Sequence, residues 1–184
     1  YLIMNSSYKK TFIEGVFEIH NESFIDQRGT FINSYRYQDK TYSQTWSNRD
    51  IKQINISFRN YVGTICGLHI QNSKKGEAKL IRCLQGKIWD VAVDLRKDSN
   101  TFGQWHSIEL SPKKGNAILI PEGCAHGFQV IEENSQLLYI HSEEWIPKQE
   151  TGIRWNDPIL DIKWPLKPTF ISEKDSLLPF LRGF

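Results

Sequence analysis

The residues best suited to chemistry lie in two segments that each begin at a glycine. Gly63 is followed after five residues by His69, and the same segment goes on to Gln71 and Lys79. An imidazole can take a proton from the carbon next to a ketone, and an ammonium group can stabilise the negative charge that then develops on the ketone oxygen. His69 and Lys79 are therefore candidates for the base and the oxyanion partner of an enolate-forming reaction.

The spacing of the two segments matches the paired motif of cupin barrels. The first segment ends at Gly86, and the second, from Gly115 to His126, fits G-x5-P-x-G-x2-H in full. Most cupins bind a metal here through three histidines and a carboxylate. Gln71 takes the place of one histidine and Lys79 that of the carboxylate, and an ammonium group repels a divalent cation. The sequence therefore predicts a cupin with no metal and no other cofactor.

The elements that must position these side chains are short β-strands. Segments rich in β-branched and aromatic residues recur between Gly, Pro, Asn and Ser, which is typical of an all-β sandwich or barrel. The sequence predicts an all-β cupin jelly-roll barrel with a short C-terminal helical segment at 172–181, begun by Ser172 as N-cap. The predicted strands are 12–19, 30–36, 53–58, 64–70, 78–84, 87–94, 104–110, 117–120, 127–131 and 136–141.

Length, charge and cysteine content limit the partners. The 184 residues fit one domain, 1–184, and 23 Lys+Arg against 21 Asp+Glu give a net charge of +2, too small for a nucleic-acid surface. No run reaches the roughly 18 apolar residues of a membrane helix. Three cysteines without CxxC spacing predict neither a disulfide framework nor a zinc site. We therefore expect a cytoplasmic protein with no nucleic-acid or membrane partner.

Longer motifs resemble one enzyme family along nearly the whole chain. They run from Asp26-Gln-Arg-Gly29 near the start to Asp161-Ile-Lys-Trp-Pro165 near the end. Between them stand Gly67-Leu-His-Ile-Gln71, Trp155-Asn-Asp-Pro158 and the segments 86–96, 99–103 and 120–128. All of these segments resemble the dTDP-4-dehydrorhamnose 3,5-epimerases, which are metal-free cupin enzymes of deoxysugar and lipopolysaccharide O-antigen biosynthesis.

The resemblance implies a catalytic set. His69 would remove protons from C3 and C5 of dTDP-4-dehydro-6-deoxy-D-glucose on the way to dTDP-4-dehydro-L-rhamnose, and Lys79 would stabilise the enolate. Asp157 would orient His69, because a carboxylate bonded to one imidazole nitrogen fixes the tautomer and stabilises the imidazolium. The family's acid aligns with Tyr139, whose phenol can return a proton from the face opposite His69.

The resemblance also implies contacts to the nucleotide-diphosphate sugar and a homodimeric assembly. An arginine fork suits phosphate oxygens, and amides suit a pyrimidine edge or a ribose. The expected substrate-binding residues are Arg28, Gln53, Asn55, Gln71, His126 and Trp145.

Three positions depart from the family pattern. Cys66 stands where an arginine usually precedes Gly-Leu-His, Ile70 replaces a tyrosine, and Trp145 occupies a second aromatic position. A C3-only epimerase of a related dTDP-, CDP- or GDP-linked 4-keto sugar therefore stays open. Two other classes also stay open: a metal-dependent cupin with His69 and His126 as ligands, and a non-catalytic sugar-binding jelly roll.

Overall fold

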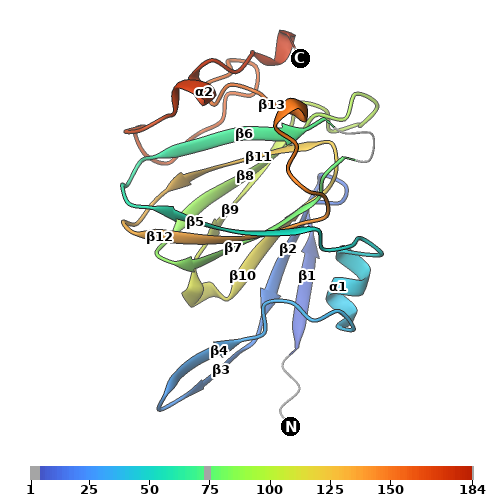
Figure 1. Cartoon of the computed structure of the whole chain (residues 1–184), viewed down its shortest axis with the longest axis vertical. Coiled ribbons are helices and arrows are strands. Elements are labelled where there is room, and N and C mark those ends of the chain that lie inside the picture. The colour runs from blue at the N-terminus through green and yellow to red at the C-terminus, as the bar shows by residue number, and fades with distance from the viewer. Residues whose placement is uncertain (1–4, 73–75, 184) are drawn as a thin grey trace.

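Two antiparallel sheets face each other in the computed structural model, which describes residues 5–72 and 76–183 (Figure 1). The larger sheet has the strand order β1 (Ser6–Lys10), β2 (Phe17–Asn21), β10 (Asn116–Ile120), β7 (Lys79–Gln85), β12 (Ser135–His141) and β5 (Gln53–Arg59). The smaller sheet has the order β13 (Glu150–Gly152), β6 (Ile65–Gln71), β11 (Cys124–Val130), β8 (Ile88–Asp94) and β9 (Trp105–Leu110).

Short elements complete the fold. A separate hairpin of β3 (Ser23–Asp26) and β4 (Gly29–Ile32) projects from the body of the molecule (Figure 1). The helices are α1 (Lys40–Thr45) and α2 (Glu173–Ser176), with single 3-10 turns at η1 (Pro112–Lys114), η2 (Pro147–Gln149) and η3 (Leu181–Gly183). Within the described residues, no helix is both long and apolar enough to cross a membrane.

The main hydrophobic core fills the space between the two sheets. Ile81 and Ile118 from the larger sheet pack there with Ala92 and Phe128 from the smaller one. Side chains alternate along a strand, so their neighbours face outward. Leu80 and Leu119, for example, pack outside the larger sheet against α1 and the loop after it.

The outer face of the smaller sheet is covered by the C-terminal segment. Leu68 and Val91 pack there against Ile153, Leu160 and Leu181. Because both faces of the central strands are covered, a strand such as β10 is buried at every position, and its sequence Asn-Ala-Ile-Leu-Ile shows no polar alternation.

The predicted all-β jelly roll is confirmed, as are most predicted strands to within a few residues. The predicted strand 12–19 is wrong at its start, because the chain turns between β1 and β2. The hydroxyl of Thr11 donates to the carbonyls of Ile13 and Val16, and Gly15 takes a left-handed φ of 82° that favours glycine. The Ser172 N-cap is confirmed: it begins α2, which is shorter than predicted.

Candidate active site

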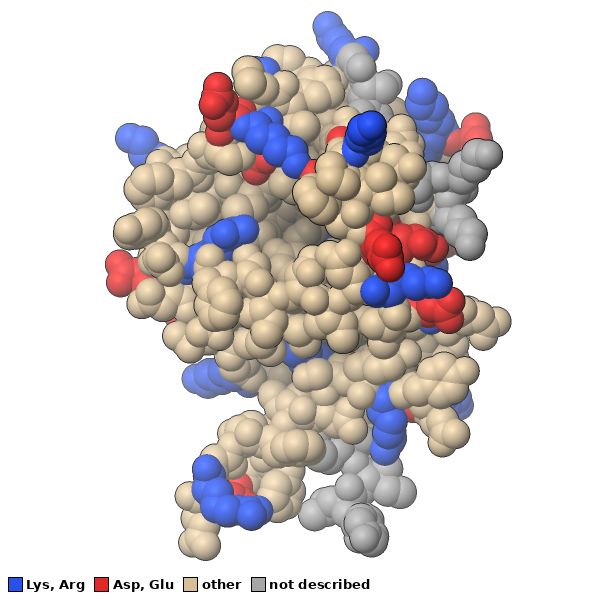
Figure 2. Space-filling view, viewed as in Figure 1, with Lys and Arg blue, Asp and Glu red and all other residues tan. Residues whose placement is uncertain are grey.

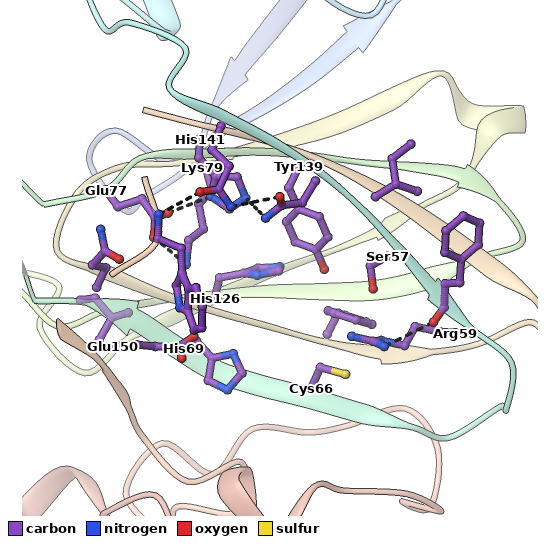
Figure 3. Close-up of a pocket in the computed structure, with 18 residues that line it drawn as sticks. Ser57, Arg59, Cys66, His69, Glu77, Lys79, His126, Tyr139, His141 and Glu150 are labelled. Atoms are coloured by element: carbon purple, nitrogen blue, oxygen red, sulfur yellow. Dashed lines mark hydrogen bonds and ion pairs between the residues drawn. The ribbon is translucent and has the colours of Figure 1, made fainter. Parts of the chain in front are cut away.

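A cavity of about 680 Å³ opens between β5 of the larger sheet and β6 of the smaller one. Figure 2 shows a hollow on this face of the molecule, and Figure 3 shows the labelled side chains that converge inside it. The cavity brings together most of the expected site residues, namely His69, Lys79, Tyr139, Gln53, Asn55, Gln71, His126 and Trp145. Arg28 and Asp157 do not line it.

His69 lies on β6 and is bonded to a carboxylate from the C-terminal segment. Its Nε2 atom lies 2.7 Å from Oδ1 of Asp175. A carboxylate only accepts hydrogen bonds, so Nε2 carries the ring hydrogen and the lone pair is left on Nδ1. Burial raises the pKa of Asp175, but the hydrogen bond from His69 and the other donors outweigh it and lower the pKa overall. Asp175 therefore stays ionised beside the imidazole.

Local interactions hold the Asp175 carboxylate in place. Ser172 caps α2 by accepting a hydrogen bond from the Asp175 amide, and Oδ2 of Asp175 accepts one from the Gly67 amide at 2.9 Å. Gly67 has a φ of 106°, and a Cβ there would lie 2.6 Å from the carbonyl oxygen of His126. Glycine at position 67 therefore lets β6 lie close to β11 next to the base.

The expected pairing of Asp157 with His69 is wrong in this structure. The Asp157 carboxylate accepts hydrogen bonds from the amides of Ile159, Leu160 and Leu181 at 2.8, 2.9 and 2.6 Å. An Asp before a proline is well suited to such turn capping, because its side chain reaches the amides that follow it. Asp157 thus holds the C-terminal segment together, and Asp175 takes the position next to the histidine.

Lys79 lies on β7 and faces the cavity together with a buried carboxylate, Glu77. The Nζ atom of Lys79 is 3.3 Å from Oε2 of Glu77, and Oε1 of Glu77 is 2.8 Å from Nδ1 of His141. Burial raises the pKa of Glu77, whereas His141 and Lys79 lower it and prevail. Lys79 is therefore a cation whose charge is already partly balanced.

Hydrogen bonds continue from Glu77 to the rim of the cavity. His141 presents Nε2 to the amide nitrogen of Asn55 at 3.3 Å, and the oxygen of Asn55 accepts from the Gln53 amide at 3.0 Å. Sequence reasoning gave Glu77 and His141 no role. His141 follows Tyr139 by two residues on β12, so strand alternation was the available signal that both side chains share one face.

Tyr139 reaches the cavity from β12, opposite the strand that carries His69 (Figure 3). Burial, with a smaller contribution from the charge of Asp90, raises the pKa of Tyr139 well above its usual value. Its ring meets the ring of His126 edge to face, with centroids 5.9 Å apart. The phenol therefore keeps its proton at neutral pH and can act as a donor.

His126 is the cross-strand partner of His69 in the pairing of β11 with β6. Its Nε2 atom lies 2.8 Å from Oδ2 of the buried Asp90. His69 and His126 are therefore each bonded through Nε2 to a carboxylate of their own, whereas His141, the third histidine of the cavity, is bonded through Nδ1 to Glu77. Neither Asp90 nor Asp175 was singled out from the sequence.

Gln71, which is buried, and Trp145, which is half exposed, also line the cavity. The side-chain amide of Gln71 donates to the Glu144 carbonyl at 2.9 Å and accepts from the Ile146 amide at 2.8 Å. The backbone amide of Trp145 donates to the side chain of Gln53 at 2.9 Å. Both polar atoms of Gln71 are thus committed to positioning the loop that carries Trp145.

Arg28 lies at the turn of the β3–β4 hairpin, outside this cavity. Its side chain is 82% exposed and bonds the carboxylate of Asp26. Within one chain, Arg28 therefore does not reach the cavity in which a substrate would be bound.

The side chains in the cavity do not fit a divalent cation. Lys79 occupies the place expected of a carboxylate ligand, and the Glu77 oxygens are used by Lys79 and His141. Over residues 5–72 and 76–183, no group of three or more His, Cys, Asp or Glu side chains comes together as a metal site would require. A base, a cation and a neutral phenol around one cavity instead define a cupin-type enzyme suited to moving protons at carbon.

Comparisons with known proteins agree with this class. The family model described as dTDP-4-dehydrorhamnose 3,5-epimerase matches residues 10–183. The dTDP-4-dehydrorhamnose 3,5-epimerase of Salmonella typhimurium is 36% identical over 173 residues, which cover 94% of this chain and 93% of the relative. The chain therefore belongs to the dTDP-4-dehydrorhamnose 3,5-epimerase family, whose members are isomerases.

Solved structures show the same relationship. An epimerase from Legionella pneumophila in complex with dTDP-4-keto-L-rhamnose superposes with a TM-score of 0.90 at 33% identity, covering 97% of this chain and 94% of that one. The 3'-monoepimerase ChmJ of Streptomyces bikiniensis, in complex with dTDP-quinovose, gives a TM-score of 0.85 at 27% identity, covering 94% and 86%. The fold thus includes relatives that differ in how many carbons they invert.

Proposed function

We propose that this enzyme inverts C3 and C5 of dTDP-4-dehydro-6-deoxy-D-glucose to give dTDP-4-dehydro-L-rhamnose. The observation that carries the proposal is the convergence of His69, Lys79 and Tyr139 on one cavity, with Asp175 bonded to His69. C3 and C5 both neighbour the C4 ketone, so the same base, cation and acid can serve both carbons in turn.

Each inversion proceeds through an enolate. Nδ1 of His69 takes the proton from the carbon, and the electron pair moves onto the C4 oxygen, where the Lys79 ammonium stabilises it. Tyr139 then gives its proton to the carbon from the opposite face, and the ketone re-forms. The Asp175 carboxylate stabilises the imidazolium while it exists, which makes Asp175 a positioning residue. Exchange with solvent returns His69 and Tyr139 to their starting states.

A C3-only epimerase is the second candidate. The structural likeness to the monoepimerase ChmJ supports it, because a base and an acid across one cavity suit either outcome. Incubation with dTDP-4-dehydro-6-deoxy-D-glucose in D2O, followed by NMR, separates the two. Deuterium at C3 and C5 supports the proposal, deuterium at C3 alone selects the monoepimerase, and deuterium at neither carbon contradicts both. CDP- and GDP-linked 4-keto sugars serve as matched alternative substrates.

We also propose that the enzyme is a homodimer. β5 is an edge strand of the larger sheet, and its alternate residues Ile54, Ile56 and Phe58 are 58%, 54% and 62% exposed. An exposed apolar stripe on an edge strand favours association with another chain, and we propose that a second copy of this chain packs against it. The projecting β3–β4 hairpin would then place Arg28 near the partner's substrate. The three free cysteines suit a reducing cytoplasm.

A further inference from the structure

One wall of the cavity carries a cation that no motif of the sequence had indicated. Arg59 is the last residue of β5, and it lines the cavity with the alternating residues Gln53, Asn55 and Ser57 of that strand. Its guanidinium carbon lies 6.0 Å from the centre of the Phe128 ring. Figure 3 shows the Arg59 side chain turned into the cavity on the side of Ser57 and Cys66.

Two polar atoms at this wall have no hydrogen-bond partner in the described part of the chain. The Nε atom of Arg59 and the Oγ atom of Ser57 are both buried without a hydrogen-bond partner among the described residues. The Nη1 atom of Arg59 donates to the carbonyl of Phe58 at 3.3 Å. No carboxylate of the described residues forms an ion pair with Arg59. A buried donor is costly when unpaired, so the half-buried guanidinium of Arg59 makes this wall suited to an anionic ligand.

The two cations of the cavity differ in this respect. Lys79 is paired with Glu77, which leaves it suited to the small charge that develops on a ketone oxygen. Arg59 has no counter-charge in the described chain, and its fork of N–H groups matches phosphate oxygens. A doubly charged group of the substrate is therefore favoured at Arg59 rather than at Lys79.

Cys66 leaves room for this arrangement. It lies on β6 opposite Phe128, and His69 lies opposite His126. An irregularity in this pairing places Cys66 and His69 only two positions of β11 apart, about 7 Å along the sheet. A hexose ring held at His69 would therefore have its phosphate within reach of the wall formed by Cys66 and Arg59. Burial raises the pKa of the Cys66 thiol against the opposing charge of Arg59, so Cys66 is a neutral, small side chain beside the guanidinium.

We propose that Arg59 binds the diphosphate of the nucleotide-linked substrate, so that β5 supplies the cation that Cys66 does not. This inference rests on the proposed function, because it takes the ligand to be a nucleoside diphosphate sugar. It makes Arg59 a specificity-determining residue for the anionic part of that substrate.

The test is calorimetric titration of dTDP and of thymidine into the whole enzyme. Removing a charge-assisted fork is expected to weaken dTDP binding about 10- to 100-fold in Arg59→Gln and to leave thymidine binding within about 2-fold. Lys113→Gln, which removes an exposed cation outside the cavity, should match the parent for both ligands. Thermal unfolding of each variant verifies that it is folded.

A double variant that moves the positive charge from β5 to β6 separates loss of the charge from distortion of the site around residue 59. Arg59→Ser combined with Cys66→Arg moves the cation from β5 to β6, and we expect it to regain most of the dTDP affinity lost in Arg59→Ser alone. Parental dTDP affinity in Arg59→Gln, with epimerisation by the parent enzyme intact, would overturn the Arg59 assignment alone. A parent enzyme that binds no dTDP would overturn both this assignment and the proposed nucleotide.

Discussion

His69 and Asp175, 106 positions apart in the sequence, are joined by a hydrogen bond of 2.7 Å between Nε2 and Oδ1. The same carboxylate accepts a hydrogen bond from the Gly67 amide on β6. The orientation of the base therefore depends on a contact between a central strand and a short helix near the C-terminus. This contact fixes which ring nitrogen is available for chemistry.

Replacing Asp175 with Asn should separate its role from that of Asp157. We expect Asp175→Asn to lower kcat about 100- to 10,000-fold, because the amide no longer holds the tautomer or balances the imidazolium. Asp157→Asn, the matched control, should lose about 1–2 kcal/mol of unfolding free energy with kcat nearly unchanged, because Asp157 only caps backbone amides. Steady-state kinetics and urea unfolding measure both. A loss of kcat confined to Asp157→Asn would reverse the assignment.

Replacing Tyr139 with Phe should stop inversion while sparing proton removal. Without the phenol, His69 can return a deuteron only to the face from which it took the proton. We expect turnover to fall about 100- to 10,000-fold and the recovered substrate to carry deuterium without inversion. NMR in D2O checks both points, with Tyr61→Phe outside the cavity as control. Product formed at the parental rate by Tyr139→Phe would exclude Tyr139 as the acid.

A charge placed within the exposed stripe of β5 should break the proposed dimer. We expect the parent to sediment as a dimer and Ile56→Glu to sediment as a monomer, because a carboxylate is costly in an apolar interface. Lys113→Glu introduces the same side chain on an exposed 3-10 turn and should remain dimeric. Sedimentation velocity decides the matter, and a monomeric parent at micromolar concentration would contradict the proposal.

Asp94 should make stability depend on pH on the acid side. Hydrogen bonds from Arg96, Ser99 and Thr101 outweigh the effect of burial and hold the pKa of Asp94 well below its ordinary 3.8. A lowered folded-state pKa gives stability that is fully present above about 3.8 and is lost as pH falls towards the folded value. Asp94→Asn should therefore cost about 2–3 kcal/mol at pH 7.

The measurement for Asp94 is urea unfolding of the parent and of Asp94→Asn between pH 7 and pH 3. The difference between the two proteins should stay constant down to about pH 5 and shrink below about pH 4. Asp98→Asn, an exposed neighbour, serves as the control. A difference that grows on acidification would show that Asp94 is not stabilised as an anion.

The part of the site that could be predicted consists of side chains at fixed positions on strands. His69 and Lys79 were predicted from the spacing of the cupin motif, and Tyr139 from the resemblance to the epimerase family. Each lies on a strand whose alternation turns its side chain into the same cavity. Gln53 and Asn55 were predicted from the resemblance to the epimerase family, and their places two residues apart on β5 explain why both face the cavity.

Contacts between distant segments could not be predicted in this way. Asp175 has a complete local explanation as a residue in the first turn of a capped helix, and only the docking of α2 on β6 brings it to His69. Arg59 likewise lies one residue beyond the predicted strand 53–58. Its proximity to Cys66 depends on how the larger sheet, which holds β5, packs on the smaller sheet, which holds β6. Helix α1 was missed because six residues show too little periodicity, although Asp39 caps it.

The most direct test of the account is deuterium incorporation by His69→Asn beside the parent enzyme. We expect the parent to place solvent deuterium at C3 and C5 of dTDP-4-dehydro-6-deoxy-D-glucose, and His69→Asn to place none at either carbon while binding dTDP with parental affinity. Incorporation by His69→Asn at a rate near that of the parent would contradict the claim that this imidazole is the base.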